Sequence, residues 1–185
     1  MAARHTFRAG NSDLTRGAPL IVLIDGRTAS SAELVAAALQ DRNRAVLVGS
    51  TSFGKGSVQA INDLPNHGTL TFTWSRMTAP SGYTFDRIGL FPAICTQSNN
   101  NDTPVHRVST ALSQRDQTAS MLTKWRTLDY RDEKSRRELR SVCPAHSNND
   151  EFDIKVALEL LKNSPDYKNL AFVGQQEIAD TFDAH

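Results

Sequence analysis

Three polar residues in the first third of the chain, Ser30, Lys55 and Gln59, could together perform nucleophilic catalysis on a carbonyl group. A serine hydroxyl is a poor nucleophile until a neighbouring base accepts its proton, and a lysine amine can be that base only in its neutral form. Burial in an apolar pocket favours the neutral amine. The Gln59 amide oxygen could orient the amine without adding a charge. We therefore expect Ser30 to be a nucleophile, Lys55 its base and Gln59 a supporting residue.

The segments around Ser30 and Lys55 predict that both residues lie at one edge of a parallel sheet. Residues 19–24 form an apolar, branched run without alternation, which is typical of a central strand covered on both faces. Residues 29–41 are strong helix formers and 44–49 form a second apolar strand, which implies a strand–helix–strand crossover with parallel pairing. The helix and the returning strand have nearly equal lengths, about 18 and about 20 Å, so the next loop returns to the edge that carries Ser30.

The start of the predicted helix gives Ser30 two interpretations. The first-turn amide of Ser31 and the helix dipole suit a developing oxyanion, so we expect Ser31 to supply an oxyanion-hole donor. Segment 30–33 also fits the S-x-x-E capping box, in which Ser30 only caps the helix and Glu33 reaches back to it. Gly54 and Gly56 would let the backbone bend tightly on either side of Lys55. The residues of this helix that we expect to face the core are Leu34, Val35, Ala38 and Leu39.

The later part of the chain predicts a hairpin followed by helices. Segments 57–61 and 69–78 are rich in β-branched and aromatic residues and are separated by the turn sequence PNHG at 65–68. Helical spacing appears at 108–126, 130–142 and 150–162, with a weak final helix near 175–182. In the third of these helices, the residues expected in the core are Ile154, Ala157, Leu158 and Leu161. On the middle one, charged pairs at i,i+4 are typical of a solvated face.

A cluster of turn-forming residues at 97–103, rich in asparagine, divides the chain into two parts of different character. We expect an α/β core at 1–96, a linker at 97–103 and a helical annex at 104–185.

The composition fits an ordinary globular protein and indicates no special class of partner. Lys plus Arg number 21 and Asp plus Glu number 20, a net charge of +1, so we expect neither nucleic acid nor an anionic membrane surface as the main partner. The apolar runs are shorter than the roughly 20 residues that a membrane span needs. Cys95 and Cys143 can form a disulfide or remain buried thiols, and two cysteines do not by themselves make a zinc site. We therefore expect no metal and no membrane span.

Segments 28–33 (TASSAE) and 53–59 (FGKGSVQ), in this order, resemble the motifs of the C-terminal processing, or tail-specific, serine peptidases. The resemblance covers residues 19–92 and includes the segment TAPSG at 78–82. It implies a crotonase/ClpP-like core of stacked β-β-α units, here partial, with a C-terminal helical extension. It also places Ser30 at the nucleophile position, Lys55 at the base position and Gln59 at the supporting position.

The same resemblance implies a serine endopeptidase that cleaves protein substrates near their C-termini through an acyl-enzyme, without a cofactor. The implied partner is a protein or peptide, oligomers stay possible, and the implied location is the periplasm or cell envelope. A Cys95–Cys143 disulfide would agree with such oxidising conditions. Because members of the family carry an upstream PDZ domain and a glycine segment that supplies a second oxyanion donor, we expect this chain to be a C-terminal piece.

Three other functions are compatible with parts of this pattern. Segment 49–55 (GSTSFGK) matches a phosphate-binding loop, but Gly56 stands where serine or threonine would bind magnesium, and a strand pattern follows where a helix is needed. A Ser-His-Asp hydrolase would need His67 or His106 near Ser30, and neither has a sequence reason to reach it. A catalytically impaired module that binds extended peptides at a sheet edge would carry identical motifs.

Overall fold

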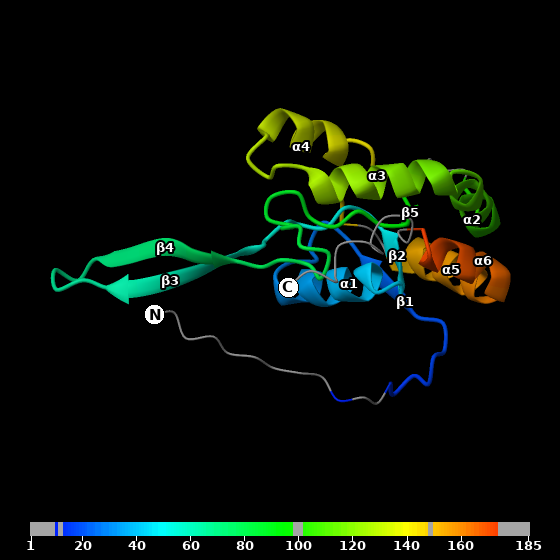
Figure 1. Cartoon of the computed structure of the whole chain (residues 1–185), viewed down its shortest axis with the longest axis horizontal. Helices are drawn as coiled ribbons and strands as arrows, with labels where there is room; N and C mark the ends of the chain where they lie inside the picture. Colours follow the sequence, from blue (N-terminus) through cyan, green and yellow to red (C-terminus); the bar gives the residue numbers. More distant parts are fainter. Residues whose placement is uncertain (1–9, 11–12, 98–101, 148–149, 174–185) are drawn as a thin grey trace, which may run out of the picture.

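The computed structural model describes residues 10, 13–97, 102–147 and 150–173, and its centre is a parallel three-stranded sheet (Figure 1). The strands are β1 (Ile21–Ile24), β2 (Val46–Gly49) and β5 (Ile94–Cys95), in the order β1-β2-β5. Parallel pairing of the first two is confirmed. The expectation that the first strand is central is wrong, because β2 holds that place and Leu23 of β1 is 40% exposed. An apolar run indicates that a strand is at least partly buried, but it does not indicate whether the strand has one neighbouring strand or two.

Helix α1 (Ser31–Asp41) makes the predicted crossover between β1 and β2 but presents a different face to the core. Leu34 and Val35 are 37% and 60% exposed, so the predicted apolar face is wrong. The side chains buried instead are Glu33, Ala36, Ala37, Gln40 and Asp41. The polar ones can be buried because they have partners; Gln40, for example, donates to the carbonyl of Phe91 at 2.9 Å.

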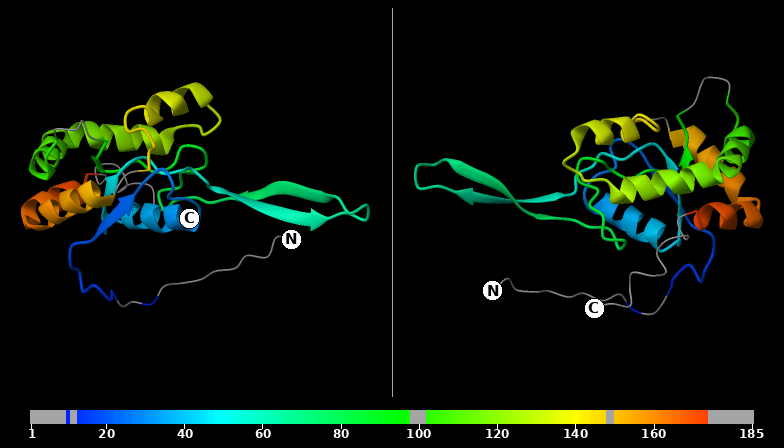
Figure 2. Two further views of the ribbon diagram at one scale, coloured as in Figure 1. Left: turned by 180° about the vertical axis from the view of Figure 1, so that it is seen from behind. Right: turned by 45° about the horizontal axis from the view of Figure 1, so that its top comes forward.

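A hairpin of strands β3 (Ser57–Asp63) and β4 (Thr69–Arg76) confirms the predicted turn and projects away from the rest of the molecule (Figures 1 and 2). It forms a sheet of its own, with a register shift between Val58 and Gln59. Phe72 and Trp74 of β4 are 43% and 66% exposed. The hairpin therefore leaves large apolar side chains at the surface.

In the described part of the chain after the hairpin, five helices stand where the sequence predicted three. Their bounds are α2 (Pro104–Ser113), α3 (Arg115–Thr127), α4 (Glu133–Arg140), α5 (Asp150–Leu161) and α6 (Ser164–Ala171). The single helix predicted at 108–126 is two helices, because the backbone turns at Gln114, the C-cap of α2 and N-cap of α3. Helix α6 was not predicted, and the helix predicted near 175–182 lies outside the described residues.

The core face predicted for α5 is largely wrong. Ile154, Leu158 and Leu161 are 41–55% exposed, and only Ala157 of the predicted set is buried. Val156 and Leu160 face the core instead, where α5 packs against α2, β1 and β2. A helix that is apolar on more than one side does not reveal from its own sequence which side its neighbours cover.

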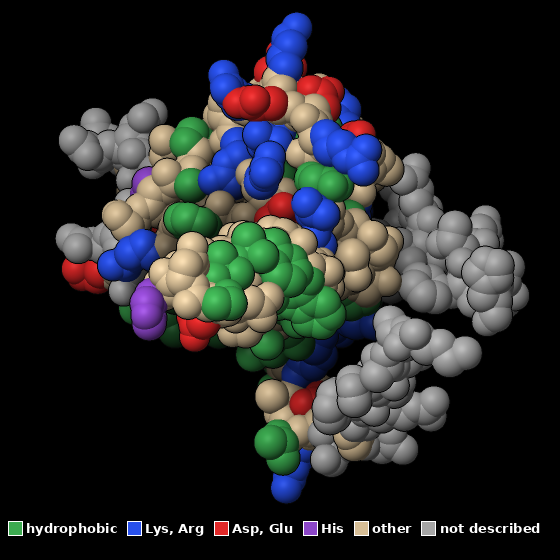
Figure 3. Space-filling view, turned by 90° about the vertical axis from the view of Figure 1, so that its left-hand side faces the viewer, with side chains coloured by type: hydrophobic (Ala, Val, Ile, Leu, Met, Phe, Trp, Pro, Cys, Tyr) green, Lys and Arg blue, Asp and Glu red, His purple; other side chains and the backbone are tan. Residues whose placement is uncertain are grey.

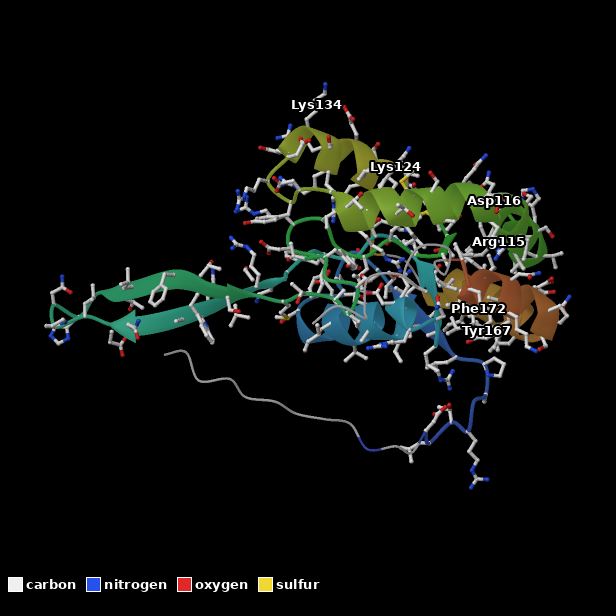
Figure 4. The ribbon with its side chains drawn as sticks, in the orientation of Figure 1. Arg115, Asp116, Lys124, Lys134, Tyr167 and Phe172 are labelled. Atoms are coloured by element: carbon white, nitrogen blue, oxygen red, sulfur yellow. A yellow bond between two sulfur atoms is a disulfide. The ribbon has the colours of Figure 1, made fainter. Side chains whose placement is uncertain are left out.

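The helices and the sheet share one hydrophobic cluster, which contains Val46, Leu47 and Ile94 from the sheet as well as Trp125 and Leu160 from the helices. In Figure 1, α3 and α4 lie on the opposite side of the strands from α1. On α6, the Tyr167 hydroxyl (Figure 4) bonds to the main chain of Leu20 and Arg44 beside β1 and β2. The annex therefore packs directly on the core. The linker predicted at 97–103 lies largely outside the described residues, and the domain boundary there stays a prediction.

A disulfide between Cys95 and Cys143 joins the end of β5 to the segment after α4, with 6.0 Å between the two Cα atoms. The disulfide hypothesis is confirmed, and the alternative of two buried thiols is wrong. In the parts of the chain that the structure describes, no helix is both long and apolar enough to cross a membrane.

Candidate active site

Ser30 lies in the sharp turn between β1 and α1 with backbone angles φ 59° and ψ −122°. A positive φ is uncommon for a residue with a side chain, and such strained positions concentrate at functional sites. A strained serine between a strand and a helix is also the arrangement by which many hydrolases expose a nucleophilic hydroxyl. The geometry of Ser30 is thus more specific than that of an ordinary helix cap.

The turn before Ser30 is held by Asp25. Its carboxylate accepts hydrogen bonds from the amides of Arg27 and Thr28, at 2.9 and 3.0 Å, and from the Arg27 guanidinium. Burial alone would raise the pKa of Asp25, but these bonds outweigh that effect and lower the pKa below its usual 3.8. The turn therefore carries a fixed negative charge at neutral pH.

Glu33 joins the Ser30 turn to the loop that contains Lys55. Its side chain is fully buried, and its Oε2 atom accepts from the amides of Ser30 and Lys55 at 2.9 and 2.8 Å. The amide nitrogens of these two residues therefore cannot be farther apart than the sum of the two bonds. The other oxygen, Oε1, accepts from the Gly54 amide at 2.7 Å and from the Ser52 hydroxyl. The predicted capping box between Ser30 and Glu33 is confirmed, and Glu33 in addition holds the second loop.

The Lys55 loop is bent tightly against its neighbours, as its two glycines predicted. The amide of Phe53 donates to the carbonyl of Thr28 at 2.9 Å, which is a second link to the Ser30 turn. Gly54 has φ +90°, and a Cβ atom at Gly56 would lie 2.7 Å from the Asp86 amide nitrogen. A side chain at either position would displace the loop.

The side chains of Lys55 and Gln59 are both exposed, Lys55 in the loop and Gln59 on β3. The burial that the sequence argument assigned to Lys55 is therefore wrong for this structure. Ser31 is the first residue of α1, so its amide is one of the first-turn donors that have no partner inside the helix. The structure brings together the main chains at positions 30, 31 and 55.

A known family matches the part of the chain that contains these elements. They are a strand, a strained serine turn, a crossover helix and a glycine-flanked lysine loop. The sequence profile of peptidase family S41 matches residues 2–95, half of the chain. The chain belongs to peptidase family S41. Its α/β core is the part that carries the match.

Several relatives are carboxyl-terminal processing proteases. A carboxy-terminal-processing protease of Bartonella bacilliformis is 47% identical over 91 residues, which are 49% of this chain and 21% of that protein. The chloroplastic carboxyl-terminal-processing peptidase 3 of Arabidopsis thaliana is 40% identical over 79 residues, 42% of this chain and 15% of the relative. A solved photosystem II D1 C-terminal processing protease is 38% identical, with a TM-score of 0.38 over 40% of this chain and 19% of that one. The chain thus spans about a fifth of the length of these proteins.

Arg140, the last residue of α4, contacts these loops, and the sequence pattern did not indicate it. Its guanidinium donates to the carbonyls of Ser52 and Ile88 beside the Lys55 loop. Burial lowers the pKa of Arg140, and the negative charge of Glu33 opposes that shift. The i,i+4 charge pattern of this helix predicted a solvated face, and nothing in it marks the one arginine that turns inward.

Positive charge gathers on the face toward which the hairpin projects (Figure 3). Arg76, at the end of β4, lies 4.8 Å from the centre of the Tyr130 ring, and Arg131 lies 5.5 Å from it. A hydrogen bond from Arg131, followed by the two positive charges, lowers the pKa of Tyr130 although its partial burial opposes this. Arg76 also pairs at 3.5 Å with Asp86, the residue packed against Gly56. Figure 4 shows Lys134 on α4 pointing outward above this region.

The alternative sites proposed from the sequence find no support in this geometry. After Lys55 the chain continues as strand β3, whereas a phosphate-binding loop is followed by a helix. His67 lies in the turn at the end of the hairpin, and His106 lies on α2 beside Asp102. No group of three histidine, cysteine, aspartate or glutamate side chains in the described ranges could hold a metal ion.

Proposed function

We propose that this chain carries the nucleophile and the base of a serine endopeptidase that cleaves protein substrates near their C-termini. The observation that carries the proposal is the strained turn at Ser30, tied through the buried Glu33 carboxylate to the loop of Lys55. Cleavage near C-termini is supported by the names of the relatives, which are carboxyl-terminal processing proteases.

In the proposed mechanism the Ser30 hydroxyl attacks the scissile carbonyl and the neutral Lys55 amine accepts its proton. The main-chain N–H of Ser31 donates to the oxyanion that forms. Lys55 then returns the proton to the leaving amine, which gives an acyl-enzyme, and water hydrolyses the ester by the reverse sequence of proton transfers. Gln59 orients the amine. Because Lys55 is exposed, a bound polypeptide that covers the loop would exclude water and favour the neutral amine.

We further propose that residues 1–96 form part of a crotonase/ClpP-like core and that the protein acts in the periplasm or cell envelope. The Cys95–Cys143 disulfide supports an oxidising compartment. The bacterial and chloroplastic relatives support an extracytoplasmic location.

The proposal is tested with a fluorophosphonate, which labels activated serine nucleophiles, followed by peptide mapping. We expect labelling at Ser30, none in Ser30→Ala, and a rate lower by about 10³-fold in Lys55→Ala. The matched control is Ser113→Ala on the exposed surface of α2, which should label at the wild-type rate. Labelling of another residue, or equal rates with and without Lys55, would refute the dyad.

A peptide-binding module without catalysis is the second candidate, and the exposed hairpin favours it. The outer edges of β3 and β4 are paired with no other described strand, so an extended peptide could add to either. Hydrolysis of an unfolded protein with an apolar C-terminus separates the two functions. If wild type, Ser30→Ala and Lys55→Ala are equally inert while the substrate still changes Trp74 fluorescence, the binding function replaces the catalytic one.

A further inference from the structure

Residues 143–146, here called the strap, contact both loops of the proposed active site. The His146 carbonyl accepts from the Gly26 amide at 2.9 Å and from the Ser50 hydroxyl at 3.0 Å. The Cys143 carbonyl accepts from the hydroxyl of Thr51. Gly26 lies in the turn that leads to Ser30, and positions 50 and 51 lead to Lys55. The strap therefore connects the two loops through contacts other than those of Glu33, and it belongs to the helical annex.

The strap packs closely against the Ser30 turn at position 26. A Cβ atom at Gly26 would lie 3.1 Å from the His146 amide nitrogen and 3.3 Å from the Ala145 Cβ. Both neighbours belong to the strap, and the nearer one is backbone that cannot rotate away. A larger residue here would require the strap and the Ser30 turn to separate by a few tenths of an ångström.

The first residue of the strap is anchored by the disulfide. Cys143 is fully buried and bonded to Cys95, which is the register partner of Gly49 at the end of β2. Just before the strap, Arg140 donates to the Ser52 carbonyl. Residues 140–146 thus contact three successive residues before Lys55, at positions 50, 51 and 52. The disulfide at Cys143 fixes this segment covalently to β5.

We propose that the strap positions the Ser30 turn and the Lys55 loop relative to one another, and that the Cys95–Cys143 bond sustains this arrangement. The inference rests on the proposed function for its catalytic consequence, but the positional effect can be measured without it. The strap is in contact with neither Ser30 nor Lys55 in the bonds described, and it acts through the main chain of Gly26 and the hydroxyls of Ser50 and Thr51. Reduction of the disulfide should therefore loosen both loops together.

Amide hydrogen exchange of the full chain, oxidised and reduced, measures the positional effect directly. We expect faster exchange in peptides covering 25–34 and 50–56, because the Gly26 amide loses its bond to the His146 carbonyl and the two loops lose the strap that connects them. A peptide covering 59–76 in the hairpin is the internal control and should not change. Unchanged exchange in both loops after complete reduction would overturn the inference.

Fluorophosphonate kinetics measure the catalytic consequence. Gly26→Ala keeps the disulfide and disturbs the contact between the strap and the Ser30 turn, and its matched control is Gly10→Ala, because a Cβ at Gly10 meets no atom within 4 Å. We expect the maximal labelling rate of Ser30 to fall about tenfold or more in Gly26→Ala and in reduced protein, with the half-saturating probe concentration unchanged. Equal rates in all forms would overturn the inference and leave the dyad intact.

The two arms separate this inference from the proposed function. If the oxidised wild type is not labelled at all, the dyad fails and hydrogen exchange alone decides the role of the strap. If reduction unfolds the chain, as seen by circular dichroism, Gly26→Ala with its intact disulfide decides it.

Discussion

Replacing Glu33 with glutamine tests whether one buried carboxylate holds both loops. The substitution changes the size of the side chain very little but converts one acceptor oxygen into an NH₂ donor. If the NH₂ group faces Ser30 and Lys55, their two amide bonds are lost. If it faces the other way, the bond from the Gly54 amide is lost, while the Ser52 hydroxyl can turn to accept from the NH₂ group. Each rotamer therefore sets the NH₂ group against at least one main-chain N–H donor.

The expected loss of stability follows from the number of bonds. A hydrogen bond to a charged group contributes about 1.5–3 kcal/mol, so one or two lost bonds correspond to a gross cost of about 1.5–6 kcal/mol. Removing a buried charge relieves part of its desolvation penalty, and the Arg140 guanidinium loses a favourable neighbour. We expect a net decrease of about 3 kcal/mol in the free energy of unfolding, within that range.

Urea denaturation followed by tryptophan fluorescence measures this change, since Trp125 is buried in the core. The matched control is Glu138→Gln on the exposed surface of α4, which should change the free energy of unfolding by less than about 0.5 kcal/mol. A loss below about 1 kcal/mol in Glu33→Gln would refute the reasoning, because a single remaining acceptor would then serve all four donors. Faster amide exchange at Ser30 and Lys55 is the accompanying local signature.

Three further substitutions test other parts of the structure. Trp125→Ala should destabilise the chain by about 3–5 kcal/mol because it empties a core site, whereas Trp74→Ala on the exposed hairpin should cost less than about 1 kcal/mol, both measured by urea titration followed by circular dichroism. Because the pKa of Asp25 is lowered in the folded state, its contribution is present above the unfolded-state value of about 3.9 and is lost as the pH falls through the folded-state value. Melting temperatures from pH 7 to pH 2 should thus show a shallower acid decline below about pH 4 in Asp25→Asn, and identical declines would exclude the effect. Arg126→Ala leaves the buried Asp41 carboxylate without the guanidinium 2.9 Å away and should cost about 3–5 kcal/mol; if adding Asp41→Asn recovers none of this, the ion pair is not the cause.

The helical annex changes the meaning of several residues that look unremarkable in the sequence. The Arg140 guanidinium donates to the Ser52 carbonyl, and the Cys143 and His146 carbonyls accept from the hydroxyls of Thr51 and Ser50. The Trp125 indole donates to the Gly89 carbonyl at 2.9 Å next to the same loops. One partner in each contact is a main-chain carbonyl, which every residue carries, so the pairing leaves no pattern that a motif could show.

Local regularities in the sequence predicted the crossover, the parallel pairing, the hairpin and most of the helices. Apolar strand runs, helix formers and the PNHG turn act over a few neighbouring residues, and their effect is independent of the rest of the chain. The same regularities brought the loops of Ser30 and Lys55 to one edge of the sheet, because a crossover of matched lengths returns to its starting level. Glycine at 54 and 56 likewise predicted a tight bend that the structure contains.

The choice of buried faces, the edge position of β1 and the exposure of Lys55 were decided only when distant segments packed together. Burial of Glu33 in α1 depends on donors about twenty residues away, and the inner face of α5 depends on where α2 and the sheet lie. The disulfide was one of two open possibilities until β5 and the strap were placed side by side. Such contacts join residues far apart in the chain, so their energies do not appear in any local window of sequence, and only the tertiary structure determines them.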